Sequence, residues 1–196
     1  MKEYLLTLAV ALVAAPLAFA QQGGWEASLS LGPCLYDRTQ GRTEIGIRSN
    51  YSDNNGVASE YDPTLLPTFI GTVGYSFSDA PFGVFMNVGW NYGWNNLKGG
   101  PSPLKEQEHI LHFVPEVRLY YLQNPKFRMY ATVGVDVRFR HFIESYRSSK
   151  CSNSDFSFGY QLSPLGLSFG DRWQISTGFG FGSLWSVVSI GAGYRF

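Results

Sequence analysis

Apolar and polar residues alternate along most of the chain that follows the first twenty residues. In the clearest run, every second residue from Phe82 to Trp94 is apolar or aromatic, and the residues between them are mostly small or polar. A period of two is typical of a β-strand with one apolar face. The pattern recurs, and it predicts eight strands at residues 25–31, 68–77, 82–94, 111–121, 127–139, 156–168, 173–181 and 188–196.

The connections between these strands alternate in length. Tight turns are expected at residues 78–81, 123–126 and 170–172, because they are rich in Asp, Asn, Gly and Pro. Long polar connections are expected at 32–67, 95–107 and 141–155, and a short one near Gly182. Short turns on one side and longer loops on the other are typical of membrane barrels. We therefore predict an all-β fold, an eight-stranded antiparallel up-and-down transmembrane β-barrel, with both ends of the barrel domain on the short-turn side.

Composition narrows the class of protein. Charged residues are 15% of the 196 positions, against about 25% in an ordinary soluble domain. Lys plus Arg and Asp plus Glu are equal, at 15 each, so no basic excess points to nucleic acid. A mean hydropathy of -0.09 is too polar for a bundle of membrane helices. Both a soluble all-β protein and a barrel with opposite faces fit these values.

The N-terminus has the features of an export signal. Lys2 precedes an apolar run from Leu5 to Leu17, and Ala18-Phe19-Ala20 is a small-x-small cleavage sequence. We expect residues 1–20 to be a signal peptide and residues 21–196 to be the barrel domain. No later apolar run reaches the 18 residues that a membrane helix needs.

Alternation alone does not say which face of the barrel is inside. A soluble lipocalin-like barrel that binds a ligand is one alternative, and Gly23-Gly24-Trp25 fits its Gly-x-Trp signature. Lipid on the outside is favoured because the charges lie opposite the apolar face and Arg dominates them, which suits a crowded interior. We expect a polar network in the lumen made of Glu26, Glu116, Arg118, Arg128, Asp136, Arg138, Arg140 and Arg195. Glu26 and Arg195 should interact, because the first and last strands must pair to close the barrel.

The end of the chain carries a resemblance. Ser189, Gly191, Tyr194 and Phe196 resemble the C-terminal assembly signal of outer-membrane proteins. The whole chain resembles small eight-stranded outer-membrane barrels of the OmpX and OmpA-domain type, and residues 113–139, 163–166 and 178–182 are similar to the porin-family small barrels of Bacteroidetes. The resemblance implies location in the bacterial outer membrane. It also implies contact with outer-membrane lipid and lipopolysaccharide, and with the barrel-assembly machinery during insertion.

Candidate chemistry is sparse. His109, His112 and His141, together with Ser145, invite comparison with lipid A-modifying barrel enzymes, but the predicted strands point His112 inward and leave Ser145 in a loop. Asp53-Asn54-Asn55-Gly56 lacks the distal Glu of a calcium loop and predicts a turn. We expect no catalytic, cofactor or metal site.

Cys34 and Cys151 are the two cysteines of the chain. Export permits a disulfide between them, but their strands are not neighbours, so the bridged and the free forms both remain open.

These features favour a non-enzymatic outer-membrane barrel with a lumen filled by side chains. Its role would be structural, or would consist of adhesion or docking through the long extracellular loops, which are rich in Tyr and Arg. A lipid A-modifying enzyme, a small pore and a soluble ligand-binding barrel are the alternatives.

Overall fold

The computed structural model describes residues 24–33, 60–77, 80–98, 104–146 and 149–196. These ranges form nine β-strands: β1 (Gly24–Gly32), β2 (Glu60–Leu65), β3 (Thr68–Ser76), β4 (Phe82–Lys98), β5 (Leu104–Gln123), β6 (Phe127–Tyr146), β7 (Ser149–Phe169), β8 (Trp173–Gly182) and β9 (Val187–Arg195). Within these residues there is no helix of the length and apolarity required to cross a membrane. The predicted signal peptide, residues 1–20, lies outside the described residues.

The strands close into one antiparallel barrel. Their order is β2-β4-β3-β1-β9-β8-β7-β6-β5, and β5 also pairs with β4, which completes the ring. β2 and β3 share one position in that ring: β2 pairs with residues 93–98 of β4, and β3 pairs with residues 83–90. The break between them falls at Leu66-Pro67, where the Leu66 amide donates to Tyr92 O over 3.0 Å. The predicted eight-stranded barrel is therefore confirmed.

The two faces of the barrel have opposite polarity. Asp136 and His112, which point inward, are completely buried, whereas Trp173 and Leu29, which point outward, are 77% and 75% exposed. The lumen thus holds the polar and charged groups, and large apolar side chains cover the outside. This is the inverse of a soluble protein, in which charged residues are almost never buried and apolar ones fill the core.

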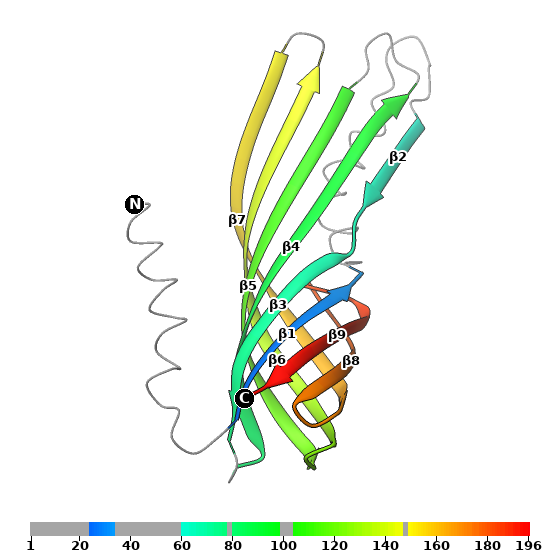
Figure 1. Ribbon diagram of the computed structural model, residues 1–196. Coiled ribbons are helices and arrows are strands. Elements are labelled where there is room, and N and C mark those ends of the chain that lie inside the picture. The colour runs from blue at the N-terminus through cyan, green and yellow to red at the C-terminus, as the bar shows by residue number, and fades with distance from the viewer. Residues whose placement is uncertain (1–23, 34–59, 78–79, 99–103, 147–148) are drawn as a thin grey trace.

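The strands differ greatly in length. β4, β5, β6 and β7 have 17, 20, 20 and 21 residues, whereas β1, β3 and β9 have 9 each and β8 has 10. In Figure 1, β2 and the upper parts of β4 to β7 rise well beyond the short strands. We call this part the projecting sheet; it consists of β2 with residues 93–98, 104–110, 140–146 and 149–155.

The projecting sheet corrects two expectations. Residues 95–107 and 141–155, predicted as long loops, are mostly the paired arms of the β4–β5 and β6–β7 hairpins. Ser145 accordingly lies on β6 rather than in a loop. The alternation of apolar and polar residues fades here, while the backbone continues to pair. Of the predicted connection at 32–67, residues 34–59 lie outside the described part of the chain.

Glycines let bulky rings cross the interior of the barrel. A Cβ built on Gly74 would lie 2.1 Å from a ring carbon of Phe85, and one on Gly166 would lie 2.2 Å from a ring carbon of Tyr130. Both rings belong to buried, inward-pointing residues. An eight-stranded barrel is just wide enough for side chains to fill it, so a large ring on one strand requires a missing side chain on its neighbour.

Candidate functional site

Glu26 on β1 lies at the centre of a buried polar cluster, at the end of the barrel where the chain terminates. Its carboxylate accepts hydrogen bonds from Ser76 Oγ at 2.9 Å and from Gln174 Nε2 at 3.4 Å. It also forms ion pairs with Arg128 and with Arg195, whose Nε is 3.5 Å away. Glu26 and Arg195 are register partners on β1 and β9, so this pair lies at the seam where the first and last strands meet.

A second ion pair lies close to the Glu26 cluster. Arg118 Nε donates to Glu116 Oε1 over 2.8 Å. The guanidinium of Arg118 also lies over the ring of Phe85, 3.7 Å from its centroid, and 5.0 Å from that of Tyr130. A guanidinium can pair through its edge and stack through its face. Charges and rings together therefore fill this level of the lumen.

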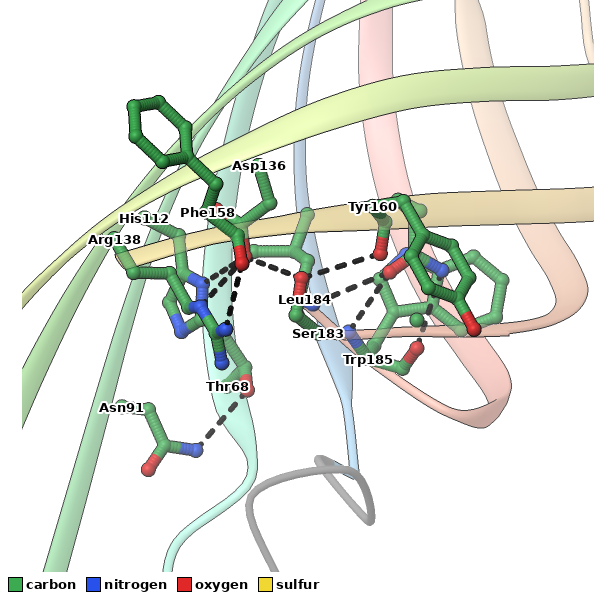
Figure 2. A network of polar contacts seen from close by, with 12 residues as sticks. Thr68, Asn91, His112, Asp136, Arg138, Phe158, Tyr160, Ser183, Leu184 and Trp185 are labelled. Carbon is green, nitrogen blue, oxygen red and sulfur yellow. Dashed lines mark hydrogen bonds and ion pairs between the residues drawn. The ribbon is translucent and has the colours of Figure 1, made fainter. Parts of the chain in front are cut away.

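Asp136 on β6 organises a third group higher in the lumen, which Figure 2 shows. Its Oδ2 atom lies 2.9 Å from His112 Nδ1, accepts a hydrogen bond from Ser183 Oγ at 2.5 Å, and lies 3.7 Å from Arg138 Nε. Arg138 also donates from Nη2 to the carbonyl of Phe158 over 3.1 Å. His112, Asp136, Arg138 and Ser183 are all at least 98% buried.

Arg140, the last of the eight predicted lumen residues, lies at the mouth of the barrel. Its Nε atom lies 3.1 Å from Glu108 Oε1 and 3.7 Å from Asp155 Oδ1. The structure thus distributes the eight predicted lumen residues over successive levels of the barrel. Each has a partner of opposite charge, although not in one continuous network.

The connection between β8 and β9 folds into the lumen, a feature that the sequence reasoning missed. Ser183, Leu184, Trp185 and Ser186 are each at least 93% buried, and we call them the plug segment. The side chain of Gln161 on β7 holds their backbone. Its Oε1 atom accepts from the amides of Leu184 and Trp185, both at 3.2 Å, and its Nε2 donates to Trp185 O at 3.1 Å.

The barrel wall is shaped to receive the plug segment. Leu184 and Trp185 pack with Ile70 and Val114 in an apolar cluster inside the barrel. A Cβ on Gly89 would lie 2.3 Å from Leu184 Cδ1, and a Cβ on Gly32 would lie 2.7 Å from Trp185 Cβ. One sequence signal could have indicated this arrangement. Leu184 and Trp185 are an apolar pair between two serines, which is unusual in a short surface connection, because such connections are normally polar.

The open edge of β7 is the second candidate site. Residues 149–160 pair with β6, whereas pairing with β8 begins at Gln161, so within the described residues no strand covers this stretch from the other side. Where the edge leaves the barrel, the Ser183 amide donates to Tyr160 O at 2.9 Å. The next carbonyl on the open side of β7 is that of Phe158, and it accepts the hydrogen bond from Arg138.

Further along the same edge, the Ser154 amide donates to its neighbour's side chain, Asn153 Oδ1, over 2.9 Å. In an antiparallel strand, alternate residues direct their backbone groups to the same side. Phe156, Ser152 and Lys150 therefore direct theirs to the open side, as Tyr160 does.

The predicted assembly residues lie at the closing strand. Ser189, Gly191 and Tyr194 are on β9, between β8 and β1, and Phe196 follows that strand. Tyr194 contacts both Trp173 and Phe196, with ring centroids 5.0 Å apart in each case. The Phe196 amide donates to Trp25 O over 2.9 Å, which ties the end of the chain to β1.

For Cys34 and Cys151, the bridged and the free forms both stay open. Cys151 is exposed on β7, near the open edge. Cys34 lies outside the described residues.

No protein-family model and no curated protein sequence matches the chain. Solved structures with similarity include Ail, the attachment invasion locus protein of Yersinia pestis, at 16% identity and a TM-score of 0.49, covering 90% of this chain and 100% of Ail. The N-terminal β-barrel domain of Pseudomonas aeruginosa OprF has 12% identity and a TM-score of 0.35, covering 89% and 98%. Neisserial surface protein A has 10% identity and a TM-score of 0.36, covering 88% and 95%. The eight-stranded fold itself rests on the strand pairing described above.

Replacing Leu184 by alanine should destabilise the barrel. Leu184 is 99% buried among side chains of the wall, so the change leaves a cavity and should lower the free energy of unfolding by about 2–5 kcal/mol. The matched control is Leu29→Ala, because Leu29 is 75% exposed on the outer face. Urea unfolding of the protein in detergent, followed by tryptophan fluorescence, measures both. Equal losses in the two variants would contradict the assignment of the plug segment as core.

The filled lumen should not conduct ions. Paired side chains occupy it at the level of Glu26, and the plug segment occupies it above. We therefore expect no steady unitary conductance when the folded protein is inserted in a planar bilayer. Mobility on a gel before and after boiling would check that the inserted protein is folded. Reproducible single-channel steps would show that the lumen holds an ion path.

Proposed function

We propose that the chain is a non-enzymatic barrel protein of the bacterial outer membrane, which presents the projecting sheet at the cell surface as a docking platform. The observation that carries the membrane location is the inverted polarity of the barrel. Charged side chains such as Asp136 are buried inside, while apolar ones such as Trp173 and Ile175 are exposed outside. In lipid, only a helix or a closed barrel satisfies every backbone group, and the described strands form a closed barrel.

The exposed apolar surface is too extensive for a soluble barrel. It covers every strand of the ring, including Leu29 on β1, Phe69 on β3, Val135 on β6, Ile175 on β8 and Ile190 on β9. Soluble monomers rarely expose contiguous apolar patches of more than a few hundred Å². A lipocalin-like barrel would in addition need an apolar interior, whereas this lumen contains ion pairs.

The short strands have the length of a membrane crossing. A tilted transmembrane strand needs about 9–11 residues. β1, β3 and β9 have 9 residues and β8 has 10, so these strands are long enough to span the membrane once. The additional residues of β4 to β7 then extend outside the membrane as the projecting sheet.

The outer boundary of the membrane can be placed on the tall side of the barrel. One outward-facing row of register partners is apolar and consists of Trp90, Leu111, Phe139 and Phe156. The next row toward the projecting sheet consists of Tyr92, His109, His141 and Ser154.

The open edge of β7 supports the same boundary. An unpaired backbone group in hydrocarbon costs several kcal/mol, so the uncapped part of the β7 edge is expected to lie at the membrane boundary or beyond it, in water. The carbonyls of Phe158 and Tyr160, which lie nearest the barrel, are the ones that Arg138 and Ser183 bind. The Phe158 and Tyr160 carbonyls are thus capped, and the first residue of the edge beyond them that faces the open side, Phe156, belongs to the last apolar row.

The docking role is supported by the open edge itself. An unpaired strand edge is a template for an added strand, and proteins that do not use such an edge usually cover or shorten it. Here the edge extends from Ser149 to Tyr160 on the side of β7 opposite β6. An extended partner segment could bind by backbone hydrogen bonds, with its side chains alternating between the two faces of the sheet.

The remaining partners follow from the membrane location. The outer face would contact outer-membrane lipid and lipopolysaccharide, and Ser189, Gly191, Tyr194 and Phe196 would be read by the barrel-assembly machinery. Tyr194 and Phe196 support this, because they form an aromatic group at the end of the barrel, where a girdle is expected at the lipid interface.

The membrane location predicts the behaviour of the expressed protein. It should sediment with the outer-membrane fraction of a bacterial host and migrate differently on a gel before and after boiling, because the closed barrel resists detergent at room temperature. Immunoblotting of the separated fractions measures both. Recovery in the soluble periplasmic fraction, with no change of mobility on boiling, would refute the proposal.

The docking role predicts a backbone-dependent interaction. Extended peptides selected from a displayed random library on the vesicle-reconstituted protein should lose binding to the Ser152→Pro variant. Proline removes the amide of Ser152, which points to the open side, without removing a hydrogen bond to β6. Ser152→Ala is the matched control, because it changes the side chain and keeps the amide. Equal peptide binding to both variants, or no peptides selected, would argue against strand addition at this edge.

A further inference from the structure

Asp155 is a charged residue of the open β7 edge, at the base of the projecting sheet. It is the register partner of Arg140 on β6 and shares the inner face of the sheet with it. Arg140 Nε lies 3.1 Å from Glu108 Oε1 and 3.7 Å from Asp155 Oδ1, so its shorter contact is with Glu108. The side chain of Asp155 is 55% exposed, against 15% for Glu108. The carboxylate of Asp155 is therefore accessible to a further cation.

The position of Asp155 on the edge favours contact with the side chain of an added strand. The Phe158 and Tyr160 carbonyls point to the open side of β7, so the backbone groups of Asp155 point to β6. In an antiparallel pair, such a residue faces its counterpart in the non-hydrogen-bonded arrangement, in which the Cα atoms are about 4.5 Å apart and the side chains are closest. A residue opposite Asp155 would thus lie beside its carboxylate, where an opposite charge stabilises the pair and a like charge destabilises it.

Phe156 sets a different requirement on the outer face of the same edge. Its side chain is 58% exposed, and its ring contacts that of Phe158 edge to face, with centroids 5.0 Å apart. Successive side chains of a strand point to opposite faces, so the residue of an added strand next to the one beside Asp155 lies beside Phe156. Because Phe156 belongs to the last apolar row of the barrel, an apolar residue is favoured at that position.

We propose that the open β7 edge binds an extended segment that has an apolar residue beside Phe156 and, as its next residue, a Lys or Arg beside Asp155. The inference rests on the docking role proposed above and specifies the chemistry of the partner. The bound segment would add a cation to the row formed by Glu108, Arg140 and Asp155. Positive and negative side chains would then alternate across four neighbouring strands.

The test compares two short peptides that differ in one charge. The Lys peptide is Thr-Val-Lys followed by a run of Thr, which places Val beside Phe156 and Lys beside Asp155 when it runs antiparallel to β7. The Glu peptide has Glu in place of Lys. Thr and Val favour the extended backbone. Fluorescence anisotropy of labelled peptides measures binding to the folded protein in detergent. We expect the parent to bind the Lys peptide about fivefold more tightly than the Glu peptide, and added salt to reduce this preference.

Variants assign the charge preference to Asp155. Asp155→Asn should remove the preference, and Asp155→Lys should reverse it, so that the Glu peptide binds more tightly. Lys150→Gln is the matched control and should keep the preference. It removes an exposed charge from the same edge, but on the other face and about 17 Å along the strand, which exceeds the screening length of about 8 Å at physiological salt. The Lys peptide with Ser in place of Val should bind the parent more weakly. The change of gel mobility on boiling reports that each variant is folded.

Failure of this inference and failure of the docking role give different results. Equal binding of the Lys and Glu peptides to the parent, with both lost in Ser152→Pro, would overturn the charge preference alone. No binding of either peptide, or equal binding to the parent and to Ser152→Pro, would contradict strand addition at this edge and the inference with it. A second copy of the chain on the edge would appear as a dimer in sedimentation velocity that excludes both peptides, which would also overturn the proposal.

Discussion

The narrow lumen of an eight-stranded barrel is the constraint on which the rest of this structure depends. The interior is just wide enough for side chains, so whatever points inward must fit and must be paired. Burial of an isolated charge costs far more than burial of a paired one. Glu26 with its arginine partners meets this condition near one end of the barrel, and Asp136 with His112 and Arg138 meets it above. Gly74 and Gly166 leave the space that the rings of Phe85 and Tyr130 occupy, so these rings also fit inside the narrow lumen.

The plug segment connects the filled lumen to the open surface. β8 ends at Gly182 because the chain turns inward there, and β7 loses its partner strand at the same level. Ser183 is the first residue of the plug segment. Its hydroxyl donates to Asp136 inside, and its amide donates to the Tyr160 carbonyl at the edge. One residue therefore seals the lumen and caps the strand that is left open. The β7 edge is a consequence of how the barrel is filled, and the projecting sheet extends from it.

The sequence pattern predicts the repeated elements of this fold, the strands, but it does not predict contacts that occur only once. Alternation identified the strands wherever one face is apolar and exposed and the other lines the lumen, as from Phe82 to Trp94. It also placed Arg195 opposite Glu26, because closure requires the first and last strands to pair. It failed at residues 95–107 and 141–155, where the described residues are mostly paired strands that extend past the ends of the short strands. It gave no pairing for Asp136 with Ser183, because such a contact depends on a single inward turn that no periodic pattern encodes.

At Val187, the requirement to fill the lumen conflicts with the requirement to keep the outer face apolar. It is the first residue of β9 after the plug segment, and its φ of 74° lies in the left-handed region, which is a genuine outlier for a β-branched residue. Such strain costs about 1–3 kcal/mol and persists only where the surroundings hold it in place. Here the surroundings on one side are the buried plug segment and on the other the β8–β9 ladder, which begins at Val187 itself. Glycine would relax the backbone, but this position is 59% exposed on the outer face, to which the valine side chain contributes apolar surface. The strain is therefore located where the chain passes within one residue from an interior that must be filled to an exterior that must be apolar.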